Sequence, residues 1–555
     1  MSVLPSNRAP LPSELAIYHQ HLYASKIAQG KVRPFVVPYH FYGLALLIAY
    51  LSIPHTNRPW LYAARWPVLA AIVLFEVKTA FQTCSIGAAT SYIAGLVSGY
   101  AIMLSISWLV WYRPQFDAKR IERRKIEVAE KEKMAKSNSN GLATAIYSNG
   151  NGSLKQRLTT NGHTNGHTNG HTSGRREDTN RHYESEYFWQ PYPDNFRGRL
   201  VWTIDLVCNQ RGERWNWAIP TLPPLPVRVK RSLGEPISLK EETQNQMTGL
   251  SSSIGNVSFP SWKALVRSHI PKIVIGYFVL DLIKTAVIND PYFLVGPNSF
   301  DLPPHLARLH WLLLRLYRQS LVFTAITLAL EVAFMLQALF MGSLALLPSV
   351  SSYLGVRAEV WMYPSQWGSF SQISNKGLNG LWGGWWHQTF RFVFAAPTNY
   401  LISRKIIEPR SMAAKFCALF FAFSISGILH ACGSMTQLGD TNPWHPFIFF
   451  MLQGLGIFLQ TVLCTSLKPL ISKLPSSVRK TGNVLFTFGW LCLTANWLID
   501  DMARGGLFTF EPIPLSPSRG LGFGPEEPKW FCMNKVELTW YTAKHWWESG
   551  IAERF

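Results

Sequence analysis

The pattern that most constrains this chain is the alternation of long apolar runs without charge and short windows that hold most of the charge. Residues 87–111, for example, contain no Asp, Glu, Lys or Arg. A spanning helix needs about 20 mostly apolar residues, and an uncharged run of about 18 is already a candidate. Apolar residues make up 48% of the 555-residue chain and charged residues only 15%, whereas roughly a quarter is charged in average soluble chains. The sequence therefore predicts an all-α, polytopic membrane protein.

The apolar stretches predict about eight or nine transmembrane helices, because one of them, 390–402, carries Arg391 and is interrupted by Pro397. In the stretch 273–288, Asp281 and Lys284 lie one helical turn apart, so we expect them to pair inside the bundle. Duplicated halves of the kind found in many transporters are not visible. The candidate stretches are 35–52, 61–75, 87–111, 273–288, 312–347, 390–402, 412–432, 444–464 and 481–499.

A charged, low-complexity window separates the first apolar stretches from the rest. Bases and acids are interleaved from Arg113 to Lys136, and the spacing of Glu127 and Lys131 favours a helix that runs out of the membrane. The tetrapeptide Asn-Gly-His-Thr then occurs three times within 161–172, a segment without apolar residues that we expect to be disordered. The excess of Lys and Arg predicts that this loop is cytosolic and, if three helices precede it, that the N-terminus is lumenal.

Two other stretches combine aromatic and polar residues. Residues 183–220 interleave Trp and Tyr with Arg, which is typical of a segment at the lipid headgroups that anchors the chain or shapes the cytosolic mouth of a site. The Trp-rich tail 537–555 is also expected to be interfacial. We therefore divide the chain into N-terminal transmembrane helices (1–112), a basic low-complexity cytosolic linker (113–182), an interfacial aromatic segment and loop (183–260), a catalytic transmembrane core (261–500) and a C-terminal interfacial tail (501–555).

Charge and cysteine content exclude several classes of protein. The net charge of +21 lies largely in loops, where it is explained by membrane topology and anionic lipid, so we expect a lipid bilayer and no nucleic acid as partner. The seven cysteines form no Cys-x-x-Cys pair, which argues against a disulfide framework or a zinc site. We expect no metal and no bound cofactor. No cleaved signal peptide is evident at the N-terminus.

Two histidines, His387 and His430, stand in a very apolar part of the chain, residues 381–433. An ionisable group at membrane depth is costly and is a candidate functional residue by default. His387 follows Trp386 and precedes Gln388, and Arg391 comes four residues later, on the same face if this part is helical. From these residues alone, acid/base catalysis, haem ligation, metal binding, proton transfer and a purely structural histidine all remain open.

The surrounding motifs carry a resemblance to a known family. Trp-Gly-Gly-Trp-Trp-His-Gln-Thr-Phe-Arg (382–391), followed by Phe-Ser-Ile-Ser-Gly-Ile-Leu-His (423–430), resembles the wax-synthase branch of the membrane-bound O-acyltransferases. It is especially similar to fungal members that acetylate terpenoid or meroterpenoid secondary metabolites. The resemblance implies an enzyme of the endoplasmic reticulum that transfers an acyl group from acyl-CoA to a hydrophobic alcohol, with His430 matching the family's catalytic histidine. His387 stands where other branches have Asn, and Gly384 and Trp385 replace two arginines of fungal relatives.

Under this resemblance the residues acquire expected roles. His430 would accept the proton of an alcohol as it attacks the thioester, and His387 or Gln388 would donate to the developing oxyanion. Since thiolate is a good leaving group and the chain has no Gly-x-Ser-x-Gly motif, no acyl-enzyme is expected. The resemblance favours acetyl-CoA as co-substrate. Trp386, Gln388, Arg391 and Ser426 are candidate substrate- or CoA-binding residues, and Arg199, Arg211, Arg214 and Arg404 are candidate phosphate partners.

Other functions fit parts of the sequence. A wax synthase would use a fatty acyl-CoA and a long-chain alcohol at the same site. A transporter would use Glu76, Asp281 and Glu331 as pathway residues. A haem or metal oxidoreductase would want clustered histidines in the apolar segments, and a prenyltransferase would want Asp-rich magnesium motifs; neither pattern is present.

Overall fold

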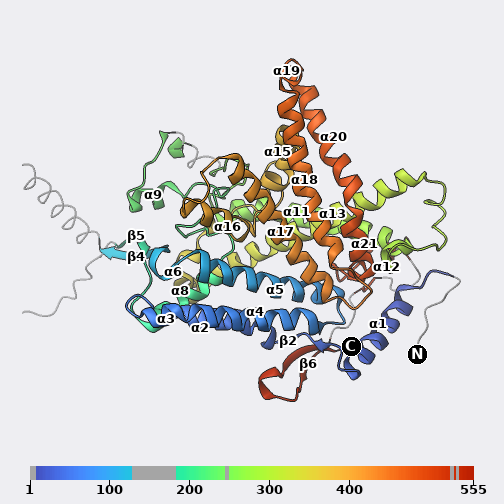
Figure 1. Ribbon diagram of the computed structural model, residues 1–555, viewed down its shortest axis with the longest axis horizontal. Helices are drawn as coiled ribbons and strands as arrows, with labels where there is room; N and C mark the ends of the chain where they lie inside the picture. The colour runs from blue at the N-terminus through green and yellow to red at the C-terminus, as the bar shows by residue number, and fades with distance from the viewer. Residues whose placement is uncertain are drawn as a thin grey trace, which may run out of the picture.

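The computed structural model describes residues 8–127, 183–239, 241–243, 249–524, 530–532 and 537–554. The expected disordered repeat lies outside these residues. Within them the protein is mostly helical, with helices from distant parts of the chain crossing in one body (Figure 1). The predicted all-α class is therefore right in the main, with short strands added at three places.

Five helices of the described chain are long and apolar enough to cross a membrane, or six if one bent pair counts as a span. The predicted eight or nine spans are thus not confirmed. Helix α2 (Tyr42–Leu51) has only ten residues, α16 (Arg391–Ser403) has thirteen, and α11 (Trp262–Ile288) is long but charged. The five are Pro59–Gln82 (containing α4, Arg65–Gln82), Ala88–Trp111 (α5, Ala88–Ile106, with a π-helical end), α13 (Trp311–Ala345), α17 (Met412–Met435) and α18 (Trp444–Ser466); the bent pair is α20 (Ser476–Thr494) and α21 (Asn496–Arg504).

Helix α17 is the central helix of the body and packs against α5, α16 and α18 (Figure 1). Its contact with α5 depends on small residues. A Cβ atom on Gly95 would lie 2.0 Å from the carbonyl oxygen of Cys432, and one on Gly99 would lie 3.1 Å from Leu429. Because small residues let helix backbones approach closely, this part of α17, which also carries His430, is held tightly against α5.

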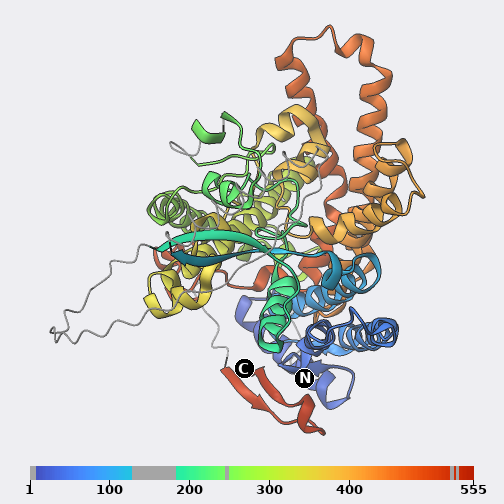
Figure 2. The same ribbon diagram turned by 90° about the vertical axis from the view of Figure 1, so that its left-hand side faces the viewer.

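Part of the basic window that was predicted to leave the membrane as a helix instead forms one strand of a β-hairpin, and the window beyond Glu127, with Lys131, lies outside the described residues. Strand β4 (Arg120–Glu127) pairs antiparallel with β5 (Tyr183–Gln190), Arg120 lying opposite Gln190. Figure 2 shows the hairpin crossing the face of the molecule. The helix prediction rested on local charge spacing, which carries no information about a partner strand beyond the linker.

The aromatic segment after β5 is also more buried than expected. Helix α8 (Phe196–Cys208) follows, and Trp202 and Trp215 are 0% and 2% exposed. Their rings lie 4.9 Å apart in an edge-on arrangement within the largest apolar core. These two rings therefore pack against other rings inside the protein, and the interfacial position of the segment remains a prediction.

The two ends of the chain meet on one side of the body (Figure 2). Helix α1 (Pro12–Ala28) reaches the loop after α17, where Lys26 Nζ donates to the Leu438 carbonyl at 2.8 Å. The C-terminal hairpin of β6 (Glu537–Tyr541) and β7 (Gly550–Arg554) pairs with β2 (Val36–Val37). Trp540 and Trp546 on this hairpin remain largely exposed, as an interfacial tail requires.

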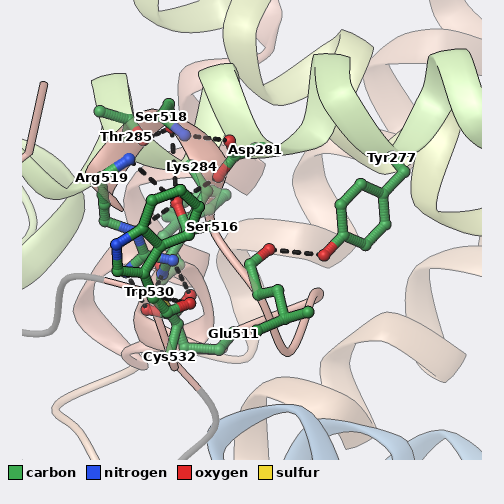
Figure 3. Close-up of polar contacts among 12 residues, drawn as sticks. Tyr277, Asp281, Lys284, Thr285, Glu511, Ser516, Ser518, Arg519, Trp530 and Cys532 are labelled. Carbon is green, nitrogen blue, oxygen red and sulfur yellow. Dashed lines mark hydrogen bonds and ion pairs between the residues drawn. The ribbon is translucent and has the colours of Figure 1, made fainter. Parts of the chain in front are cut away.

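A buried polar cluster fastens the C-terminal loop 505–532 to α11 (Figure 3). The Asp281 carboxylate accepts from the Ser516 hydroxyl and, at 2.8 Å, from the Ser518 amide. Lys284 Nζ donates to the Phe508 carbonyl at 2.6 Å. The predicted Asp281–Lys284 pair is therefore wrong: each group binds the loop, which offers backbone and hydroxyl partners that the sequence spacing did not reveal. Arg519, fully buried, completes the cluster with a two-pronged ion pair to Glu511 at 2.8 and 3.1 Å.

Candidate active site

A π-helical turn positions the first histidine. Helix α15 (Ser371–Gly380) runs into the turn Leu381–Trp385, after which the chain is extended at Trp386 and resumes as α16 at Arg391. The turn is packed too closely for side chains at one of its glycines, since a Cβ on Gly384 would lie 2.9 Å from the Gln372 side chain. Such π-helical turns are frequent at functional sites.

Gln388 and Arg391 hold this turn together. The Gln388 amide donates to the carbonyls of Trp382 (2.9 Å) and Trp386 (2.6 Å). Arg391 Nη1 donates to the Gly383 carbonyl at 3.1 Å and to Gln388 Oε1 at 2.5 Å. His387 and Arg391 were expected to lie on one face if this part of the chain were helical. The chain between them is not helical, so that expectation does not apply. The predicted roles of Gln388 and Arg391 in binding substrate or coenzyme A remain predictions.

His387 lies in an aromatic shell at the end of the turn. Its Nδ1 is 3.1 Å from the Thr389 hydroxyl. The rings of Trp367, Phe334 and Trp386 have their centroids 5.7, 5.9 and 5.4 Å from the imidazole. The histidine is half-buried, so part of its surface faces an internal space rather than neighbouring side chains.

His430 is held by its own helix in one tautomer. Its Nδ1 is 2.9 Å from the Ser426 carbonyl, four residues earlier on α17. A carbonyl oxygen only accepts hydrogen bonds, so Nδ1 carries the proton and Nε2 keeps a free lone pair. The Phe450 ring packs on the imidazole at 4.4 Å. Ser426 thus acts through its backbone, and its predicted role in substrate binding remains a prediction.

A row of packed aromatic rings links the two histidines. The centroid of Trp386 is 5.4 Å from that of His387, Trp382 is 5.4 Å from Trp386, and Phe450 is 5.9 Å from Trp382 and packs on His430 at 4.4 Å. That the two histidines act in one site remains a prediction.

A cavity of about 560 Å³, a size typical of small-molecule and cofactor sites, lies beside His387, although neither this histidine nor His430 is among its lining residues. Its inner end, next to His387, is formed by Trp367, Phe334 and Thr389, which also contact that histidine. Its polar wall comes from α11, α13 and the loops that follow α8 and α13. The lining residues that carry or can carry a charge are Arg211, Glu213, His269, Lys272, Glu331 and Arg357.

A charged cluster, of which Arg357 lines the cavity and the other members lie behind it, carries an excess of positive charge. Asp205 is shared by Arg214 at 2.8 Å, Arg120 at 3.5 Å and Arg357 in close contact, while Glu122 takes Arg120 and Arg214 at 3.0 Å. Three guanidinium groups thus share two carboxylates, an excess of one charge. Burial, with the repulsion of Arg214, lowers the pKa of Arg120 to about 9, so the group is still protonated at neutral pH. An anionic ligand in the cavity would relieve this repulsion.

The four arginines predicted to bind phosphate lie in different surroundings. Arg211 lines the cavity, although it also pairs with Glu213 at 2.9 Å. Arg214 is one layer behind, in the cluster around Asp205. Arg199 donates to the Ser52 carbonyl at 3.0 Å and Arg404 lies over the Tyr400 ring, and neither is among the residues lining the cavity.

Sequence reasoning missed His269, Lys272 and Arg357. The predicted span began at residue 273, one residue after Lys272, so the polar first half of α11 was left out. The signal that would have found it is the spacing of His269 and Lys272, one turn apart before an apolar run. Arg357 lies in a short turn, Gly355–Ala358, that follows helix α14 (Pro348–Leu354) and carries no motif, so its place in the cavity depends on the tertiary fold alone.

Comparisons with known proteins match the segment of the chain that contains the two histidines. Residues 363–452, which contain both histidines and the π-helical turn, match the Membrane bound O-acyl transferase family. The chain is 28% identical over 100 residues to acetyltransferase spyB of Aspergillus fumigatus (18% of this chain, 17% of the relative). It is 23% identical over 277 residues to O-Mevalon transferase macI of Penicillium terrestre (48% and 53%) and 30% over 120 residues to acetyltransferase ple2 of Rhodocybe pseudopiperita (21% and 32%).

The resemblance to membrane-bound O-acyltransferases of fungal secondary metabolism is thereby confirmed. The chain spans about half or less of the length of each of these curated relatives.

Proposed function

We propose that this protein is a membrane-embedded O-acyltransferase that moves the acetyl group of acetyl-CoA to a hydroxyl of a hydrophobic, terpenoid-like secondary metabolite. The observation that supports the proposal is the fixed tautomer of His430, which leaves a lone pair on Nε2, in the segment that matches the family. The apolar helices support an integral membrane protein, and we place it in the endoplasmic reticulum.

The base in this mechanism is His430. An alcohol is a poor nucleophile at neutral pH, so Nε2 accepts its proton while the oxygen attacks the thioester carbonyl. The tetrahedral intermediate then collapses, the carbon–sulfur bond breaks, and the coenzyme A thiolate takes the proton back from the imidazolium. The hydrogen bond from Nδ1 to the Ser426 carbonyl keeps the ring oriented throughout.

The oxyanion of the intermediate needs a positioned donor. His387 provides one when the Thr389 hydroxyl donates to its Nδ1, because Nε2 then carries the proton. Gln388 is a weaker candidate, since its amide nitrogen already donates to two carbonyls.

Acetyl-CoA is proposed to occupy the cavity. Its phosphates match the excess of positive charge at Arg211, Lys272 and Arg357, and its thioester would reach the inner end near Trp367 and Thr389. The aromatic shell supports a short donor. The Phe450 ring packs on His430 at 4.4 Å and four rings surround His387 within 6.3 Å, so a long alkyl chain would have to displace packed rings.

The test is ester formation by membranes that contain the full chain. Wild type is given radiolabelled acetyl-CoA or palmitoyl-CoA with a panel of lipophilic alcohols, and labelled ester and free thiol are measured. We expect ester from acetyl-CoA and a loss of about a hundredfold or more in His430→Ala, the order expected for a general base. His305→Ala, an exposed histidine, is the matched control.

Each other outcome removes one part of the proposal. Ester from palmitoyl-CoA alone identifies a wax synthase. A mutant that retains most activity moves the base away from His430. If no alcohol yields ester with either donor, the proposed transfer is wrong and transport becomes the function to test.

A further inference from the structure

A second polar group lies near His430, among residues that do not line the cavity. Tyr92 on α5, Ser434 on α17 and Asp501 on α21 are 7%, 0% and 1% exposed. The Tyr92 hydroxyl, the Ser434 hydroxyl and Asp501 Oδ2 have no hydrogen-bond partner among the residues that the structure describes. Buried polar atoms are nearly always paired, so three unpaired atoms in one neighbourhood require an explanation.

The geometry directs two of these groups to the catalytic histidine. Ser434 follows His430 by four residues, so both side chains lie on one face of α17. The Tyr92 ring lies against Gly433, where a Cβ would be 3.0 Å from its Cζ atom, and its centroid is 6.3 Å from the His430 ring. Glycine at 433 thus leaves the room that lets Tyr92 approach His430.

Asp501, on α21, is the third member of the group and contacts the loop after α17. Its Oδ1 accepts from the Asn442 amide at 2.6 Å, and the carboxylate lies beside Ser434. The group therefore offers two hydroxyls, which donate and accept, and a carboxylate oxygen, which accepts. A small O–H group complements this set, because it can accept from one hydroxyl and donate its own proton.

We infer that Tyr92, Ser434 and Asp501 form a hydroxyl site that presents an O–H group to His430. The reacting hydroxyl of the acceptor alcohol occupies this site during transfer, and water occupies it when alcohol is absent. The inference rests on the proposed function and adds the direction of attack: the nucleophile comes from the α5 and α21 side, and the thioester from the α11 and α13 side.

A further activity follows from water in the same site. His430 Nε2 takes a proton from water, the water oxygen attacks the acetyl-CoA carbonyl, and the carbon–sulfur bond breaks. Acetate and coenzyme A are released, the thiolate taking up the proton from His430. The protein therefore hydrolyses acetyl-CoA slowly when no alcohol is present.

The experiment uses purified full-length protein in nanodiscs, with acetyl-CoA alone or with the best alcohol from the panel. Free thiol, labelled acetate and labelled ester are measured for wild type, Tyr92→Phe, Ser434→Ala and His430→Ala. Ser424→Ala is the control, because it removes a hydroxyl from another face of α17, where Ser424 lies 3.4 Å from the Met451 sulfur. Thermal unfolding of each variant checks that the fold is kept.

We expect wild-type hydrolysis about tenfold or more above His430→Ala. Tyr92→Phe and Ser434→Ala each lower hydrolysis and transfer about five- to tenfold, the range for one lost hydrogen bond, while the KM for acetyl-CoA stays within about twofold. The control Ser424→Ala leaves both rates within about twofold of wild type.

The inference is overturned if Tyr92→Phe and Ser434→Ala lower transfer no more than Ser424→Ala. It is also overturned if wild-type hydrolysis does not exceed that of His430→Ala while ester still forms. Hydrolysis that depends on Tyr92 and Ser434 without ester from any alcohol would support the site and contradict the proposed transfer, so the two failures are distinguishable.

Discussion

At the scale of single residues, the chemistry depends on which nitrogen of each imidazole carries a proton. The carbonyl of Ser426 settles this for His430, whereas His387 depends on a hydroxyl that can act either way. Thr389 is therefore the residue that decides whether His387 is a donor or an acceptor in the site.

Replacing Thr389 by valine tests this dependence. Thr389→Val keeps the shape of the side chain but removes the proton that holds the tautomer, so we expect kcat to fall about tenfold, or about 1.4 kcal/mol of transition-state stabilisation. The KM for acetyl-CoA should not change. Thr389→Ser, which keeps the hydroxyl, should have a kcat close to that of wild type. Steady-state kinetics check this, and a valine variant with more than half of wild-type kcat would contradict it.

Lys272 is the cavity cation whose removal is most informative. It lines the cavity and has no ion-pair partner among the described residues, so Lys272→Ala should raise the KM for acetyl-CoA about tenfold or more, as for a lost charge-assisted contact. Lys263→Ala, on the exposed start of the same helix, is the matched control.

The measurement is repeated with 3′-dephospho-acetyl-CoA. If the ratio of the KM for 3′-dephospho-acetyl-CoA to the KM for acetyl-CoA is the same in Lys272→Ala as in wild type, Lys272 binds the pyrophosphate. If wild type prefers acetyl-CoA and the variant does not, Lys272 binds the 3′-phosphate. A KM equal to that of Lys263→Ala would remove Lys272 from the donor site.

At the scale of elements, the π-helical turn is the part whose backbone the site needs most. Gly383 and Gly384 are neighbours, but a Cβ on Gly384 meets the Gln372 side chain at 2.9 Å, while one on Gly383 meets only Asn379 Oδ1 at 3.2 Å. We expect Gly384→Ala to shift the turn and reduce kcat about tenfold or more, and Gly383→Ala to stay within about threefold. Ester formation by both variants checks this; equal rates would show that the turn yields without effect on His387.

The cluster that fastens the C-terminal loop to α11 makes a stability prediction. Arg519 is fully buried and makes a two-pronged ion pair with Glu511, so Arg519→Ala leaves this carboxylate with only the longer contact to Lys284 at 3.7 Å and should cost about 3 kcal/mol. Arg231→Ala breaks an exposed pair with Glu242 and should cost at most about 1 kcal/mol. Denaturation in detergent compares the two; similar losses would contradict a stabilising cluster.

Elements also show why part of the structure was predictable and part was not. Uncharged runs such as 87–111 predict spanning helices from their composition alone. His387 and His430 could be singled out because they are polar residues in an apolar part of the sequence. Strand β4 was missed because its partner begins at Tyr183, beyond the linker. The cavity cations were missed because Lys272 and Arg357 meet only through the packing of α11, α13 and the loop that follows.

At the scale of the whole molecule, the contacts of the termini predict topology. Helix α1 touches the loop after α17, and β7 pairs with β2, so both ends lie on one side of the body. The basic β4–β5 hairpin belongs to the cytosolic side by its charge. Two candidate spans precede the linker and, if the bent pair counts as one, four follow it, so both termini lie on the same side of the membrane as the linker. We expect tags at both termini and a tag within 161–172 to be cut by protease added to sealed microsomes; a protected tag at either terminus would contradict the arrangement.

The hairpin has a further consequence for how the chain can be rebuilt. Because Glu127 lies opposite Tyr183 in the ladder, the two ends of the segment between them are held side by side. Closing a longer or shorter loop between fixed ends changes its entropy only slowly with length. Residues 128–182 are therefore a natural graft point, where a fluorescent protein or an antibody epitope can be inserted, or a short turn substituted, without altering the path of any helix that carries the site.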